Sequence, residues 1–297
     1  MKKWLIAFRL RTLPLALASV AMGGFLAVQA GGFRWNVFLL CCLTTTFLQI
    51  LSNLANDYGD SIHGADHHGR KGPVRAVQSG VISADSMKDA VILFSILSLG
   101  SGLWLLWEAL HGDLLMMSVW LVIGLGSIAA AITYTAGNKP YGYMGLGDVS
   151  VLVFFGVIAV LGSAYMISGN WYWPGMAPAL ASGMVAVGVL NINNIRDIDS
   201  DRHAGKFSFP VRFGRKAAVV YHQLLLWGAV ALCLGYVLSL PRIAPSHFLF
   251  LAAVPVFHRI NRAVATLDPE LLDPWLKKMA LAALLFTLLF GAGITLG

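Results

Sequence analysis

Nine long apolar segments constrain what this 297-residue chain can fold into more than any other feature of its sequence. Each is about 20 residues long, the length at which an α-helix crosses the hydrocarbon core of a bilayer. Charged residues make up 12% of the chain, about half their share in an average soluble protein. With a mean hydropathy of +0.73, the sequence predicts an all-α, polytopic membrane protein. The predicted spans are 13–31, 36–56, 89–110, 114–134, 147–168, 174–195, 217–239, 246–264 and 276–296.

The distribution of Lys and Arg predicts the orientation of these spans. If the N-terminus lies in the cytoplasm, all 21 basic residues except Arg34 and Arg242 fall in cytoplasmic segments. Positive residues of short connections stay on the cytoplasmic side of a membrane. The net charge of +7 is therefore interpreted as a topology signal, and we expect contact with the lipid bilayer rather than with nucleic acid.

The chain is expected to form one transmembrane domain, 1–297. Two long polar connections, at about 57–88 and 196–216, lie on the predicted cytoplasmic face, whereas the outer connections are short. The spacing N-x-x-x-D occurs at Asn53–Asp57 and again at Asn193–Asp197. This recurrence indicates a possible internal repeat, in which spans 1–4 correspond to spans 5–8.

Two clusters of carboxylates stand at the polar ends of the second and sixth spans. On a helix, Asp57 and Asp60 share a face at i, i+3, and Asp197 and Asp201 share a face at i, i+4. Unpaired carboxylates so close together would repel, whereas Mg²⁺ bound between carboxylate and phosphate oxygens stabilises the ionised form. We therefore predict a metal site formed by the two clusters. Asn53 and Asn193 stand one turn earlier on the same faces.

Each cluster alone could instead be a solvated loop at the membrane surface, paired with nearby basic residues. Two clusters with matching Asn offsets on one face of the membrane favour a functional site. Asp66 is a weaker candidate metal ligand, Asp199 is expected to point away, and the role of Asp148 is left open. The basic residues Arg70, Lys139 and Lys206 are candidate phosphate-binding groups. The alternative role for these basic residues is anchoring to lipid headgroups.

Several segments resemble the signatures of a known family. The stretch S-N-L-A-N-D-Y-G-D at 52–60 and the stretch R-K-G-P-V-R-A-V-Q-S-G at 70–80 closely resemble the first signature of the UbiA superfamily of membrane prenyltransferases. The version resembled is that of the branch acting on 1,4-dihydroxy-2-naphthoate. Three further segments match in family order, at 9–15, 132–148 and 190–206. The first motif departs from a strict D-x-x-x-D pattern, because Ser61 stands where the second acid would fall.

The resemblance implies a bundle of nine helices around a central cavity, with cytoplasmic loops capping a Mg²⁺-diphosphate site. The four aspartates of the two clusters would bind the metal, and Asn53 and Asn193 would help to orient them. Arg70, Lys139 and Lys206 would neutralise the diphosphate, and Tyr134 would contact substrate. The implied reaction transfers a polyprenyl group from polyprenyl diphosphate to dihydroxynaphthoate with loss of CO₂, giving demethylmenaquinone. The implied location is the bacterial inner membrane.

Other functions remain open at this stage. A related prenyltransferase could use another acceptor, such as 4-hydroxybenzoate or haem. A secondary transporter is suggested by the repeat, but it does not explain two acidic clusters on one face. A CDP-alcohol phosphotransferase would also use Mg²⁺ in a membrane, but its D-G-x-x-A-R type of signature is missing from the sequence.

Overall fold

The structure, a computed structural model, describes residues 2–62 and 75–297. These ranges are helical and contain no β-strand. Nine stretches within them are long and apolar enough to cross a membrane, which confirms the predicted all-α fold for this part of the chain. The stretches are Lys3–Gln29, Trp35–Ile62, Ala84–Leu110, Leu114–Thr133, Gly147–Ser168, Trp173–Arg196, Phe209–Leu238, Pro245–Thr266 and Pro269–Leu296.

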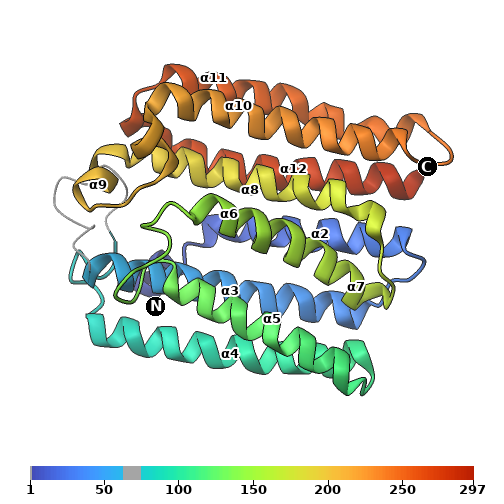
Figure 1. The fold of residues 1–297 in the computed structure, drawn as a ribbon, viewed down its shortest axis with the longest axis horizontal. Helices are drawn as coiled ribbons and strands as arrows, with labels where there is room; N and C mark the ends of the chain where they lie inside the picture. The colour runs from blue at the N-terminus through green and yellow to red at the C-terminus, as the bar shows by residue number, and fades with distance from the viewer. Residues whose placement is uncertain (1, 63–74) are drawn as a thin grey trace.

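The spans lie side by side in one bundle (Figure 1). Four of them are single helices, namely α3 (Trp35–Ile62), α4 (Ala84–Leu110), α5 (Leu114–Thr133) and α10 (Phe209–Leu238). The others combine shorter elements. These are α1 (Lys2–Ala7), η1 (Leu10–Thr12) and α2 (Leu13–Gln29); α6 (Gly147–Val151), η2 (Leu152–Gly162) and α7 (Ser163–Ser168); η3 (Trp173–Gly175) and α8 (Met176–Arg196); η4 (Pro245–Ala253) and α11 (Val254–Thr266); η5 (Pro269–Leu272) and α12 (Asp273–Leu296). The short helix α9 (Ile198–His203) follows α8.

Local sequence signals explain where several helices begin and break. The side chains of Ser83 and Asp113 accept backbone N–H groups of the first turns of α4 and α5, the usual role of these residue types at an N-cap. Gly214 interrupts α10 with φ +82°, a conformation that glycine adopts without strain. The second span continues to Ile62 rather than ending at the predicted 56. Both acids of the first cluster therefore lie on the helix α3 itself.

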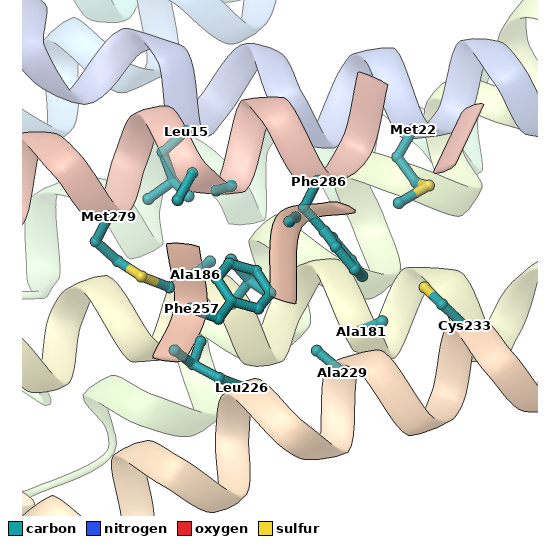
Figure 2. Packing of buried hydrophobic residues seen from close by; sticks show 14 of the residues in the cluster. Leu15, Met22, Ala181, Ala186, Leu226, Ala229, Cys233, Phe257, Met279 and Phe286 are labelled. Carbon is teal, nitrogen blue, oxygen red and sulfur yellow. The ribbon is translucent and has the colours of Figure 1, made fainter. Parts of the chain in front are cut away.

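The C-terminal half of the bundle is closely packed. Side chains of α2, α8, α10, α11 and α12 form one continuous hydrophobic core. Figure 2 shows Phe257 and Phe286 within this core, near small side chains of α8 and α10, and the centroids of these two rings are 5.3 Å apart. The element η2 is a π-helix that packs on α8 through Gly156 and Gly183. A Cβ atom at Gly156 would lie 2.8 Å from the carbonyl oxygen of Ala179. Small residues allow such close approach of membrane helices.

Arg34, one of the two basic residues on the predicted outer side, has a clear structural task. Its guanidinium donates to the carbonyl oxygens of Met166 at 2.5 Å and Ile167 at 3.1 Å, near the end of α7. A third bond of 3.0 Å goes to the carbonyl oxygen of Ala109, near the end of α4. Carbonyl groups at helix C-termini lack partners within the helix, so Arg34 joins two helix ends.

Candidate active site

Both acidic clusters lie at one end of the bundle, where α3 and α8 end and α9 lies (Figure 1). The buried ammonium of Lys206 shows how close they come. Burial alone would lower the pKa of Lys206, but the nearby carboxylates, Asp201 first and then Asp60, raise it above its ordinary value. A single lysine from the loop after α9 therefore interacts with acids of both clusters.

In the first cluster, the side chains of Asn53 and Asp57 form hydrogen bonds with other segments of the chain. The Asn53 amide donates to the carbonyl oxygen of Phe8 and to the hydroxyl of Thr12, both at 3.0 Å. The Asp57 carboxylate accepts the backbone N–H of Ala76 at 3.1 Å and of Val77 at 3.4 Å. These bonds attach the N-terminal segment and the segment after 74 to the end of α3.

Asp60 is held by two side chains from different loops. Its Oδ1 accepts a 2.7 Å hydrogen bond from the hydroxyl of Tyr143, and its Oδ2 forms an ion pair with Arg75. Arg75 also donates to the backbone carbonyl of Asn56 at 2.8 Å. Burial, followed by the charge of Asp60, raises the pKa of Tyr143. Tyr143 therefore remains a hydrogen-bond donor throughout the physiological pH range.

In the second cluster, the buried Arg196 holds both oxygens of Asp197. Its Nε donates to Oδ1 at 2.8 Å and its Nη2 donates to Oδ2 at 2.7 Å. The same Nη2 lies 2.8 Å from Oδ1 of Asn193. The remaining terminal nitrogen, Nη1, donates at 2.5 Å to Asp273, the first residue of α12. Asp197 stands at the joint between α8 and α9, with φ −97° and ψ 14°.

Asp201, one turn beyond Asp197, pairs with the loop that follows α9. Lys206 Nζ lies 3.4 Å from its Oδ1, and the hydroxyl of Ser208 donates to its Oδ2 at 3.1 Å. Burial, with the neighbouring charge of Asp197, raises the pKa of Asp201 although Lys206 opposes the shift. Tyr134 is part of the same group. Burial, with the nearby Asp148 and Asp201, raises its pKa to about 12.

Hydrogen bonds join two loops at this end of the bundle, the loop before α6 and the loop after α9. The N–H of Phe207 donates to the carbonyl oxygen of Tyr143 at 2.9 Å, and Arg212 donates to the carbonyl oxygens of Met144 at 2.6 Å and Phe207 at 3.0 Å. Gly145 lies beneath this junction with φ +79°, and a Cβ atom there would lie 2.6 Å from the Phe207 carbonyl oxygen. Gly145 thus permits a turn and a close contact between the two loops.

A cavity of about 380 Å³ extends from Asp60 into the apolar bundle. At its polar end it is lined by Asp60, Arg75, Tyr134, Asn193 and Lys206. Its other walls come mainly from α3, α4, α5, η2 and α7 and are largely apolar. They include Leu48, Leu103, Leu106, Trp120, Ile123, Phe154, Phe155 and Met166. The cavity can hold an elongated ligand with one anionic end and one hydrocarbon end.

A second cavity, of about 330 Å³, adjoins the same residues. Asp57 and Arg196 line it, and Arg75 and Asn193 line both cavities. The two acids of the first cluster thus face different spaces, Asp60 the large cavity and Asp57 the smaller one. Arg9 also lines both cavities, and the remaining walls of the smaller one come from Leu5, Ile6, Leu10, Arg11 and Ala76.

Most of the predicted site residues that the structure describes gather here, but Lys139 does not. Lys139 is exposed in the loop between α5 and α6 and is not among the residues that line the two cavities. Asp66 and Arg70 lie outside the described residues, so their predicted roles stay predictions. The site also contains residues that were not predicted for it: Arg75, Tyr143, Arg196 and Asp273. Arg75 lies in the same motif as Arg70, and Arg196 directly precedes Asp197, but no motif marks Asp273.

The donor atoms of this site suit Mg²⁺, which prefers carboxylate and carbonyl oxygens. Within the ranges 2–62 and 75–297, no three acidic, histidine or cysteine side chains are close enough to hold a metal ion together. Basic side chains and backbone amides pair with the carboxylates instead. A divalent cation bound here would exchange with these partners, with Asp57, Asp60, Asp197 and Asp201 as the residues that would hold it.

The fold and the site define a class of protein. It is a helical membrane bundle that encloses an apolar cavity, and acidic and basic side chains line one end of that cavity. Comparison with known proteins agrees. A profile of the UbiA prenyltransferase family matches residues 16–271. The chain belongs to this family, and it is a membrane prenyltransferase.

The relatives cover nearly the whole chain. It is 46% identical over 99% of its length to 1,4-dihydroxy-2-naphthoate octaprenyltransferase of Escherichia coli, covering 95% of that protein. It is 43% identical over its full length to the protein of the same name from Haemophilus influenzae, covering 97% of it. Among solved structures, a UbiA homolog from Archaeoglobus fulgidus bound to GPP and Mg²⁺ matches with a TM-score of 0.67 and 19% identity, with 99% of each chain covered. An apo UbiA homolog from Aeropyrum pernix matches with a TM-score of 0.69 and 21% identity, with 96% of this chain and 97% of that one covered.

Proposed function

We propose that this chain transfers a polyprenyl group from polyprenyl diphosphate to 1,4-dihydroxy-2-naphthoate, with loss of CO₂, in menaquinone synthesis. The observation that carries the proposal is the large cavity, which joins acidic and basic side chains at one end to an apolar channel at the other. A polyprenyl diphosphate has the same division of polarity. The names of the full-length relatives support the naphthoate acceptor.

Mg²⁺, which accompanies GPP in the A. fulgidus homolog, would neutralise the diphosphate and favour its departure. Asp57, Asp60, Asp197 and Asp201 would hold it, with Asn193 beside them. The four aspartates are buried, so water screens their charges weakly. Electrostatic groups are most effective when they are fixed in place before charge develops.

The basic residues of the site would act on the leaving group. When the allylic C–O bond breaks, its electron pair departs with the diphosphate, and negative charge grows on the phosphate oxygens. Lys206 and Arg75, which already lie at the polar end of the cavity, would stabilise this charge more in the transition state than in the ground state. Lys139 and Arg70 are proposed to assist from the loops.

The acceptor then completes the reaction. The electron-rich naphthoate ring forms a C–C bond with the allylic carbon, and loss of its carboxylate as CO₂ restores aromaticity. This ending requires no strong protein base. We further propose that the site faces the cytoplasm of a bacterial inner membrane, where the polyprenyl tail stays in lipid and the diphosphate stays in water.

The test is a product assay with a choice of acceptor. Detergent-purified protein is incubated with Mg²⁺, a polyprenyl diphosphate, and either dihydroxynaphthoate or 4-hydroxybenzoate, and products are identified by mass. We expect a decarboxylated, prenylated 1,4-dihydroxynaphthalene with the first acceptor, and no product when EDTA replaces Mg²⁺. Product from hydroxybenzoate alone would assign the chain to another acceptor, and equal product in EDTA would remove the metal.

A further inference from the structure

A chain of charged side chains links the second acidic cluster to the ninth span. Arg196 is 2% exposed and contacts Asp197 and Asp273 at the same time. The carboxylate of Asp273 also accepts hydrogen bonds from the guanidinium of Arg11. The Nη1 atom of Arg11 lies 3.0 Å from Oδ2 and 3.3 Å from Oδ1 of Asp273. Asp273 therefore lies between two arginines, one buried and one partly exposed.

The contacts of Arg196 raise a physical problem for a metal site. Both oxygens of Asp197 accept its hydrogen bonds, yet the same oxygens must turn to a cation if Asp197 binds one. An arginine cannot lose its charge in a protein. A buried charge that loses its partner costs several kcal/mol, so Arg196 needs a second carboxylate when Asp197 departs. Asp273 is already in contact with it, at 2.5 Å.

We propose that Asp273 is a positioning residue for the second acidic cluster. It keeps Arg196 neutralised and in place while Asp197 exchanges the guanidinium for a divalent cation. The proposal rests on the proposed function, because it assumes that Asp197 takes part in a metal-diphosphate site. Residues that support metal ligands in this indirect way typically change metal affinity or activity by about 10–100-fold when they are removed.

The arrangement predicts different effects for replacing Asp273 and for replacing its partner Arg11. Within the described part of the chain, Asp273→Asn leaves Arg196 with the carboxylate of Asp197 alone, so cation binding weakens. Arg11→Gln frees Asp273 to pair more fully with Arg196, so cation binding strengthens or stays unchanged. If Arg11 acts through Asp273, Arg11→Gln has no further effect in the Asp273→Asn background, because coupled residues are not additive. A contact that merely joins the spans would instead weaken binding in both variants.

The test measures Mn²⁺ alone, by electron paramagnetic resonance of the purified full-length chain, with no substrate present. We expect Asp273→Asn to bind Mn²⁺ about 10–100-fold more weakly, and Asp273→Glu to recover most of the loss. Asp268→Asn is the matched control, because Asp268 is exposed, precedes η5 and makes no side-chain capping bond. Melting temperatures are recorded for every variant, so that the comparison is made on folded protein.

A second measurement separates positioning from general damage. In the turnover assay, Asp273→Asn should raise the Mg²⁺ concentration that gives half-maximal rate and should recover most of the rate at saturating Mg²⁺. Unchanged Mn²⁺ binding in folded Asp273→Asn would overturn the proposal, as would a wild-type chain that binds no Mn²⁺. A chain that shows these Mn²⁺ shifts but does not prenylate dihydroxynaphthoate would overturn only the proposed acceptor.

Discussion

At the scale of single residues, the two N-x-x-x-D motifs have the same spacing but different contacts. Asn53 holds the N-terminal segment through Phe8 and Thr12, whereas Asn193 lies against Arg196 and lines both cavities. The shared sequence pattern therefore predicts a functional site at both positions, but it does not predict that the two asparagines have the same role. The proposed internal repeat stays a prediction.

Asp60 and Asp201, one from each cluster, both raise the pKa of Lys206, and they provide a direct test of the carboxylates. We expect Asp60→Asn and Asp201→Asn each to lower kcat by about 10²–10³-fold, the loss typical of a removed electrostatic group at a reacting centre. Asp199→Asn is the control, because its side chain is 59% exposed. Product formation and melting temperature are measured together, and a folded variant with near-normal kcat would exclude that acid from the site.

Tyr143 can be tested by removing one oxygen atom. Its hydroxyl donates to Asp60 at 2.7 Å, and a hydrogen bond to a charged group contributes about 1.5–3 kcal/mol. We expect Tyr143→Phe to reduce kcat/KM by about 10–100-fold. Because burial and Asp60 raise the pKa of Tyr143, the ratio of mutant to wild-type rate should be constant between about pH 6 and pH 9. Tyr165→Phe, beside Trp171, should have no such effect.

At the scale of elements, hydropathy predicted where the spans lie. The polar end of the second span lies beyond its predicted position for a physical reason. Asp and Asn lower mean hydropathy but do not stop a helix, so α3 continues through Asp57 and Asp60 to Ile62. Arg75 contacts Asp60, which is 15 residues earlier in the sequence. Both residues belong to the segments that resemble the first family signature, so sequence motifs can suggest this contact. Arg196 and Asp273 are 77 residues apart, with two membrane spans between them in the sequence. Only the packing of α12 against α8 creates that contact.

The junction of the two loops depends on Gly145. At φ +79° a side chain costs about 1–3 kcal/mol in backbone strain, and the Cβ atom would also meet the Phe207 carbonyl oxygen. Gly145→Ala should therefore lower the melting temperature and reduce turnover, because the loop that carries Tyr143 shifts. Gly126→Ala in α5 is the control, since nothing lies within 4 Å of a Cβ atom there. Equal melting temperatures for the two variants would contradict this account.

Two glycines of helix α5 form a matched pair of positions for testing which ligand the cavity binds. Gly124 lines the cavity and Gly126, two residues further on, is not among its lining residues. Gly124→Leu should shift product chain length toward shorter tails and lower kcat/KM for long donors by about 10–200-fold, the range for small changes of fit in an apolar pocket. Gly126→Leu should leave the length preference unchanged. Competition between short and long diphosphates measures both, and identical profiles would place the tail elsewhere.

At the scale of the whole molecule, the predicted orientation remains to be tested by labelling. In a background with Cys41, Cys42 and Cys233 replaced by alanine, single cysteines are placed at the exposed Lys139 and Asn170. Positive-inside topology predicts that the cysteine at 139 reacts with a membrane-impermeant reagent in inverted vesicles, and the one at 170 reacts in intact cells. The reverse pattern would place the active site outside.

The helix α5 has one more consequence for the molecule as a whole. None of its residues, all of which the structure describes, is buried, and its inner face borders the cavity. The bound hydrocarbon tail would thus supply packing that the polypeptide lacks, and substrate would complete the hydrophobic interior of this half. Ligand at about 100 times its Kd stabilises a folded protein by about 2.7 kcal/mol. A polyprenyl diphosphate should accordingly bind more tightly than pyrophosphate, and it should raise the melting temperature more when both are present at the same free concentration.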